Sequence, residues 1–145
     1  IMSSPISQRS VVDVKATAIK HKSIADQLVC AHAISGCDIV AQFYGIGKGT
    51  VLKVINSSLK LSKLGNPKIA IDDVVLEAES FITACYGVRD AKTMSDARYK
   101  TWCSKMGNKK LSSAPPLKVL PPTSKAFELN VKRAHLQTAI WLSAL

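Results

Sequence analysis

The sequence lacks any run of about 18 apolar residues, the length that a membrane-spanning helix needs. It also lacks a signal peptide, because residues 1–5 are not a basic stretch followed by an apolar one. These absences predict an intracellular protein without a membrane partner. The chain starts at Ile1 instead of Met, which suggests a piece of a longer protein.

Cysteine is scarce, and its spacing does not indicate a metal site. The four cysteines are Cys30, Cys37, Cys85 and Cys103, and no Cys-x-x-Cys pair occurs. Cys30, His32 and Cys37 do not match the spacing of a common zinc finger, and no fourth ligand is evident. We therefore expect free, mostly buried thiols in a reducing compartment, without a disulfide framework.

Acidic residues are few. The chain has 10 Asp and Glu against 20 Lys and Arg, which gives a net charge of +10. Residues 92–133 hold ten bases and two acids, whereas residues 72–79 hold four acids and no base. The acidic segment is better explained by the first turn and solvated face of a helix than by a metal site. The basic excess predicts a polyanionic partner, nucleic acid first, and the alternative is that it only aids solubility.

The sequence contains enough apolar residues for one folded domain. Its 145 residues are 47% hydrophobic and 21% charged, which is ordinary for a globular protein. Apolar residues recur at helical spacing, and no internal repeat is visible. The predicted fold is all-α, with about five helices. They are expected over about residues 23–34, 48–61, 71–86, 93–106 and 124–145.

Capping signals set two of these boundaries. Ser23 with Asp26 and Thr93 with Asp96 place a hydroxyl and a carboxylate three residues apart at the start of a helix. The inward face of the helix over 93–106 is expected to consist of Tyr99, Trp102, Cys103 and Met106.

The predicted elements divide the chain into three parts. Residues 1–22 are expected to form an N-terminal arm, and the loose alternation at residues 11–14 also fits a strand of a missing domain. Residues 23–62 contain a helix–hairpin–helix element. Residues 68–145 form a helical C-terminal part, in which a flexible, basic, Pro-rich loop at residues 107–122 precedes the last helix.

The most informative segment is a glycine-rich turn directly before a helix, Phe43-Tyr44-Gly45-Ile46-Gly47-Lys48-Gly49-Thr50. Glycine permits a turn with positive φ and lets a phosphate approach the backbone. The apolar Ile46 is expected to lock two helices together, and the first N–H groups of the next helix then face an anion. The residues expected to bind nucleic acid are Gly45, Ile46, Gly47, Lys48, Gly49, Thr50 and Lys53. Such contacts read the backbone, so binding should be independent of sequence and sensitive to salt.

This segment resembles a known family. An apolar helix ending in Ser35-Gly36-Cys37-Asp38, followed by Tyr44-Gly45-Ile46-Gly47-Lys48, is similar to the helix–hairpin–helix region of structure-specific 5′ nucleases of the flap endonuclease family. The resemblance covers roughly residues 20–60. It implies a grip on the DNA backbone and a monovalent cation at the hairpin. It also makes Asp38 the position that inherits the role of a metal ligand.

A second resemblance covers the entire chain. Short segments match an uncharacterised transposon-derived domain of fish and cnidarians, and no activity comes with this match. The matching segments are residues 32–38, 97–99, 120–124 and 133–141.

The carboxylates for catalysis are missing. Two-metal phosphodiester cleavage needs several carboxylates that converge on the ions, and this chain offers Asp38 with Asp13 as the one further candidate. The remaining acids would come from an upstream domain of the parent chain. We therefore expect no catalytic residue and no cofactor in this piece by itself, and Mg²⁺ only in a full-length parent.

Further basic residues are expected to extend the interface: Arg98, Lys105, Lys109, Lys110, Lys118 and Arg133. Trp102 and Trp141 fit stacking on bases, but their place on apolar helix faces favours core packing. His135 beside Arg133 fits a phosphate contact, and a satisfied surface histidine is the alternative.

Three functional hypotheses follow. The first is a sequence-independent module that binds the backbone of duplex or branched DNA, in a nuclease-like, transposon-derived nuclear protein. The second is a helical protein–protein interaction or scaffold domain, in which the hairpin is only a packing corner. The third is the C-terminal part of an active metal-dependent 5′ nuclease.

Overall fold

The computed structural model describes residues 12–57 and 59–144. Over these residues the fold is all-α, as predicted: six α-helices are joined by loops and short 3₁₀ turns, and the described ranges contain no sheet. The α-helices are α1 (Val14–Lys20), α2 (Leu28–Ile34), α3 (Lys48–Asn56), α4 (Ile71–Cys85), α5 (Met94–Met106) and α6 (Ser124–Ser143). The 3₁₀ turns are η1 (Lys22–Gln27), η2 (Leu111–Ser113) and η3 (Leu117–Val119).

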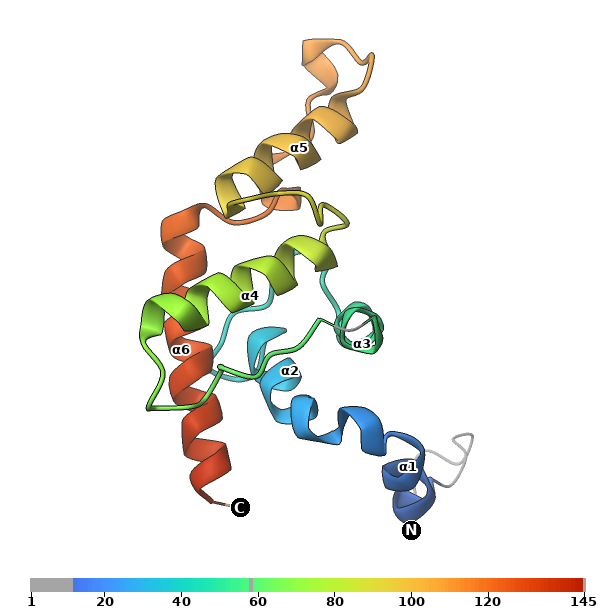
Figure 1. The fold of residues 1–145 in the computed structure, drawn as a ribbon. Helices are drawn as coiled ribbons and strands as arrows, with labels where there is room; N and C mark the ends of the chain where they lie inside the picture. The colour runs from blue at the N-terminus through green and yellow to red at the C-terminus, as the bar shows by residue number, and fades with distance from the viewer. Residues whose placement is uncertain (1–11, 58, 145) are drawn as a thin grey trace.

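The long helix α6 is the central element of the fold. It contacts α2 most extensively, and α4 packs across it (Figure 1). Ala33 of α2 and Ala134 of α6 are both fully buried, and small side chains of this kind let two helices approach closely. Phe81 of α4 and Phe127 of α6 are among the largest buried side chains, so the core lies between these three helices.

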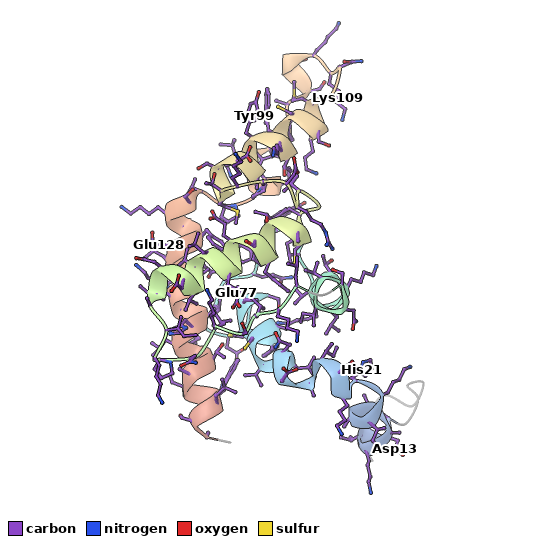
Figure 2. All side chains as sticks on the ribbon, in the orientation of Figure 1. Asp13, His21, Glu77, Tyr99, Lys109 and Glu128 are labelled. Atoms are coloured by element: carbon purple, nitrogen blue, oxygen red, sulfur yellow. The ribbon has the colours of Figure 1, made fainter. Side chains whose placement is uncertain are left out.

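The helices α1 and α5 project from opposite ends of this core. Helix α1 has no buried residue and lies at the same end of the molecule as the C-terminus (Figure 1). Helix α5 starts against α4 and α6 and then extends beyond them. The loop after α5 turns at the outer end of the molecule, where Lys109 is located (Figure 2).

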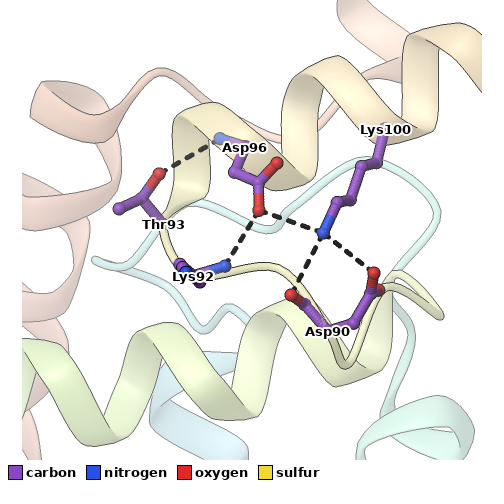
Figure 3. A network of polar contacts seen from close by, with 5 residues as sticks. All are labelled: Asp90, Lys92, Thr93, Asp96 and Lys100. Atoms are coloured by element: carbon purple, nitrogen blue, oxygen red, sulfur yellow. Dashed lines mark hydrogen bonds and ion pairs between the residues drawn. The ribbon is translucent and has the colours of Figure 1, made fainter.

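The start of α5 is fixed by a small polar network. The Thr93 hydroxyl accepts from the Asp96 N–H at 3.1 Å, as the capping pattern predicts, and the Asp96 carboxylate accepts from the Lys92 N–H at 3.0 Å. The Lys100 ammonium pairs with Asp96 at 3.1 Å and with Asp90 at 2.8 Å (Figure 3). The ion pairs raise the pKa of Lys100 and contribute to lowering the pKa of both carboxyls.

Two helices are shorter than the apolar pattern predicts. The segment expected as one helix over 23–34 begins as η1, and only Leu28–Ile34 is α-helical. Its predicted cap at Ser23 is wrong, because η1 starts one residue earlier and has no side-chain cap. Helix α3 ends at Asn56 instead of about residue 61, since the chain leaves it to bring Leu61 and Leu64 into the core.

The expected inward face of α5 needs correction, whereas the strand of a missing domain at residues 11–14 stays a prediction. Val11 lies outside the described residues and Val12 forms an isolated bridge. Val14 begins α1, which Asp13 caps by accepting from the Ala16 N–H at 3.0 Å. On α5, Tyr99 is 65% exposed and Cys103 is also exposed. Met94, Ala97, Thr101 and Met106 are the buried residues of α5. The reason is that only the first part of α5 lies against α4 and α6.

Candidate nucleic-acid interface

The hairpin before α3 has the glycine turn that the sequence predicts. Gly45 has φ of 75°, a conformation that glycine adopts readily and other residues rarely do. Ile46 is 2% exposed and belongs to the core, and its N–H donates to the Phe43 carbonyl at 3.1 Å. The Gln42 side-chain amide donates to the Ile46 carbonyl at 3.1 Å. Ile46 therefore anchors the hairpin, as expected, and its own backbone groups are used within the turn.

The start of α3 is open to solvent. Gly47 is the N-cap, with extended backbone and no side-chain hydrogen bond to the first turn. The Thr50 N–H donates to the Gly47 carbonyl at 3.1 Å, whereas Lys48 and Gly49 occupy the two positions where a helix has no internal acceptor. A Cβ added at Gly45, Gly47 or Gly49 would meet nothing within 4 Å. An anion therefore has free access to this end of the helix.

The ammonium of Lys48 points back into the fold. It donates to the His32 carbonyl at 2.8 Å, to the Ser35 hydroxyl at 2.7 Å and to the Gly36 carbonyl at 2.6 Å. These acceptors lie at the C-terminal end of α2, where the helix dipole favours a positive charge. Partial burial lowers the pKa of Lys48. The Lys48 side chain thus joins α3 to the end of α2, and it also places a positive charge beside the hairpin.

Lys53 and Asp38 lie at two other places. Lys53 is exposed in the last turn of α3, about 7.5 Å along the helix axis from Lys48. Asp38 is exposed in the turn after α2 and shares a shallow hollow with Arg133. Among the described residues no three His, Cys, Asp or Glu side chains gather to hold a metal ion. The described residues therefore do not bring together the ligand set of a two-metal site.

Four of the expected basic residues line two hollows beside the hairpin. A groove of about 550 Å³ between the hairpin, α5 and α6 is lined by Arg98, Lys118 and Arg133. A second hollow of about 350 Å³ lies between Gly45, Ile46 and α5, and Lys105 lines it. Tyr44 and Tyr86 line both hollows.

The cations of these hollows are not neutralised by the fold. Neither hollow has an acidic lining residue, and the three ion pairs of the described residues involve only Lys100 and Lys132 as cations. The Arg98 guanidinium donates to the Pro121 carbonyl, which anchors it at the rim. Leu120 and Pro121 are buried, so the end of the basic loop is packed against the body of the protein. Lys109 and Lys110 are exposed further out.

The thiols, predicted as free, are free. Cys30 and Cys85 are buried, whereas Cys37 is half-buried and Cys103 is exposed. Burial raises the pKa of Cys30 to about 11 and that of Cys85 to about 12. The Cys30 thiol donates to the Leu64 carbonyl at 3.5 Å, which is a structural role.

The other aromatic and imidazole candidates are also used in packing. Trp141 is half-buried against the core and stacks on His32 with 5.5 Å between the ring centres, which joins α6 to α2. Nδ1 of His135 accepts from the Gly65 N–H at 3.0 Å, so this histidine is a satisfied partner of the loop before α4. Trp102 is half-buried on α5 and lines neither hollow.

The sequence reasoning missed the two tyrosines. Tyr44 is 55% exposed at the junction of the two hollows. The hydroxyl of Tyr86 is buried and has no hydrogen-bond partner within the described chain, and burial raises its pKa to about 12. Tyr44 directly precedes the glycine turn, which was the available signal. Tyr86 follows α4 and gave none, since only the tertiary fold brings it there.

No family model, no curated protein and no solved structure matches the chain. No helix of the described residues is long and apolar enough to pass through a membrane.

Proposed function

We propose that this chain is a DNA-backbone-binding module that acts independently of base sequence. The observation that carries the proposal is the uncapped start of α3, which is open at Gly45, Gly47 and Gly49. Unpaired N–H groups and the positive end of the helix dipole attract a phosphate there. The unneutralised cations Arg98, Lys105, Lys118 and Arg133 lie around the adjoining hollows and add a long-range attraction.

The wider setting of this function is part of the same proposal. The hairpin element and Asp38 support a nuclease-like parent whose further acids lie in an upstream domain. The resemblance of residues 32–38, 97–99, 120–124 and 133–141 supports a transposon-derived one. Its place would then be the nucleus. Catalysis is not assigned to the residues described here, because they do not assemble a metal site.

One observation favours a second candidate, a helical protein–protein interaction or scaffold domain. The Lys48 ammonium is engaged with α2, as a packing corner requires. In that case the open start of α3 binds no ligand, and a charge substitution there leaves the affinity of the chain for every partner unchanged.

A charge placed at the start of α3 separates the two candidates. Gly49→Glu puts a carboxylate where the phosphate would bind, and it suits the first turn of a helix, so the fold is retained. We expect the affinity for a labelled duplex at low salt, measured by fluorescence anisotropy, to fall by about tenfold or more, with a shallower salt dependence. Ser80→Glu on α4 changes the net charge equally, away from the hairpin, and serves as the control. Equal affinities of the two variants would contradict the proposal.

A further inference from the structure

We propose that the two hollows on either side of Tyr44 bind an unpaired stretch of nucleic acid, with the Tyr44 ring as the stacking platform. The inference rests on the proposed nucleic-acid function and adds the kind of strand that this surface takes. It uses a surface that adjoins the open start of α3 and shares Gly45 with it.

The dimensions of the hollows favour single nucleotides. Their volumes, about 550 and 350 Å³, lie in the range of small-molecule sites. A base inside a duplex is stacked and paired, so it has no free face to offer to such a hollow. An unpaired base can be splayed out and inserted.

The charges that line the two hollows favour a nucleic-acid strand over an apolar partner. Arg98, Lys118 and Arg133 line the larger hollow and Lys105 the smaller one, with no carboxylate in either lining. Apolar side chains line the larger hollow together with these cations, among them Leu117 and Leu129. Cations combined with apolar surface match the phosphates and base faces of a single strand.

The aromatic ring lies where the hollows meet. Tyr44 lines both and is 55% exposed, so its ring is accessible to a ligand that occupies either hollow. Stacking on such a ring is tolerant of base identity, since every base has a π-face. The exposed ring therefore supplies the contact that a phosphate-binding hairpin lacks.

Two buried hydroxyls point to a polar ligand as well. Thr101 is 8% exposed and lines the smaller hollow, and neither its hydroxyl nor that of Tyr86 has a partner within the described ranges. A buried hydroxyl without a hydrogen bond is unfavourable. The base edges and sugar oxygens of a nucleotide supply donors and acceptors for both groups.

The test compares strands and variants on the entire 145-residue chain. Oligothymidine and oligouridine of about 12 nucleotides and a blunt duplex of equal length are titrated at low salt by fluorescence anisotropy. Tyr44→Ala should weaken single-strand binding on the order of tenfold and change duplex binding less than about twofold. Tyr44→Phe should restore single-strand affinity. Tyr99→Ala, at a tyrosine that is 65% exposed on α5 and outside both hollows, should leave it unchanged.

Two outcomes would overturn the inference. The first is Tyr44→Ala binding both single strands as tightly as the unmodified chain, which leaves charge alone as the attraction. The second is no single-strand binding by the unmodified chain under conditions where the duplex binds, in which case the proposed function survives. Conversely, Gly49→Glu without effect on the duplex, together with a Tyr44-dependent single strand, would remove the hairpin proposal and leave this inference standing.

Discussion

Among single residues, Lys48 combines two roles, because its ammonium is hydrogen-bonded within the fold and the residue itself begins α3. Three oxygen acceptors at the end of α2 surround its ammonium within 2.6 to 2.8 Å. Charge-assisted bonds of this kind stabilise more than neutral ones, and a cation at a helix C-terminus adds to the effect. The lysine nearest the proposed phosphate is therefore also a residue that stabilises the fold.

Removing this charge should lower stability. Lys48→Met keeps the length and apolar stem of the side chain and deletes the three hydrogen bonds. We expect the free energy of unfolding, measured by urea denaturation, to fall by about 1–2 kcal/mol. Lys53→Met, on the same helix and exposed, should cost less than about 0.5 kcal/mol. Equal stability of the two variants would show that the Lys48 contacts contribute nothing.

His135 makes the stability of the fold depend on pH. Its Nδ1 accepts from the Gly65 N–H, which only an unprotonated nitrogen can do, and burial lowers its pKa from the usual 6.5. The unfolded chain then binds the proton more readily than the folded one. The stabilising contribution is complete above pH 6.5 and is lost as the pH falls below it toward the lowered folded pKa.

Denaturation between about pH 5 and 8 measures this contribution. The unmodified chain should gain stability as the pH rises to 6.5 and then level off. His135→Gln should lack that gain, whereas His21→Gln, at an exposed position, should retain it. A gain that persists in His135→Gln would assign the effect to another group.

At the scale of elements, acidic side chains of α4 hold the neighbouring segments. The Glu77 carboxylate accepts from the Ser62 N–H at 3.0 Å, the Ser62 hydroxyl at 2.7 Å and the Lys63 N–H at 2.8 Å. Glu79 accepts from the Met94 N–H at the start of α5. The acidic cluster thus fixes the loop before α4 and the helix after it.

Glu77→Ala should release that loop. Three hydrogen bonds to one carboxylate are lost, two of them from backbone N–H groups, and we expect a cost of about 1–2 kcal/mol in urea denaturation. The control is Glu128→Ala, which removes an exposed pair with Lys132 on α6 and should lower stability much less than Glu77→Ala does. A smaller loss for Glu77→Ala than for the control would refute the role of Glu77.

The elements that the sequence predicted correctly are those with several agreeing local signals. The helix over Met94–Met106 combines a Thr93 cap with an apolar start, and the glycine turn at Gly45 precedes a helix that begins at Lys48. The first turn of α4 carries Asp72 and Asp73, as helix electrostatics favours. Local sequence signals are sufficient to predict a helix or turn where tertiary packing does not oppose them.

Errors arose where packing decides. Apolar residues after Asn56 continue the helical pattern of α3, but Leu61 reaches the core from the loop that follows this helix. The Leu61 N–H donates to the side-chain carbonyl of Gln27 at 2.7 Å. The larger hollow depends on Tyr86, Arg98 and Arg133, which come from separate segments of the chain. No local pattern encodes that meeting, so Tyr44 and Tyr86 were not recognised in advance.

At the scale of the whole molecule, the charge is divided between structural and available groups. Lys48 and Lys100 are engaged with oxygen acceptors of the fold. Arg133, Lys105 and Lys118 carry no ion pair within the described ranges and lie around the hollows beside the hairpin. A net charge of +10 with this distribution favours a polyanion that spans the start of α3 and these hollows.

Binding of a backbone phosphate at the start of α3 can be followed through the amide signals of residues 47–50 in an NMR titration with a short duplex. We expect the N–H resonances of Lys48 and Gly49 to shift most and to return with added salt, while those of α1 stay in place. Resonances of Lys48 and Gly49 that do not move at saturating duplex would contradict it.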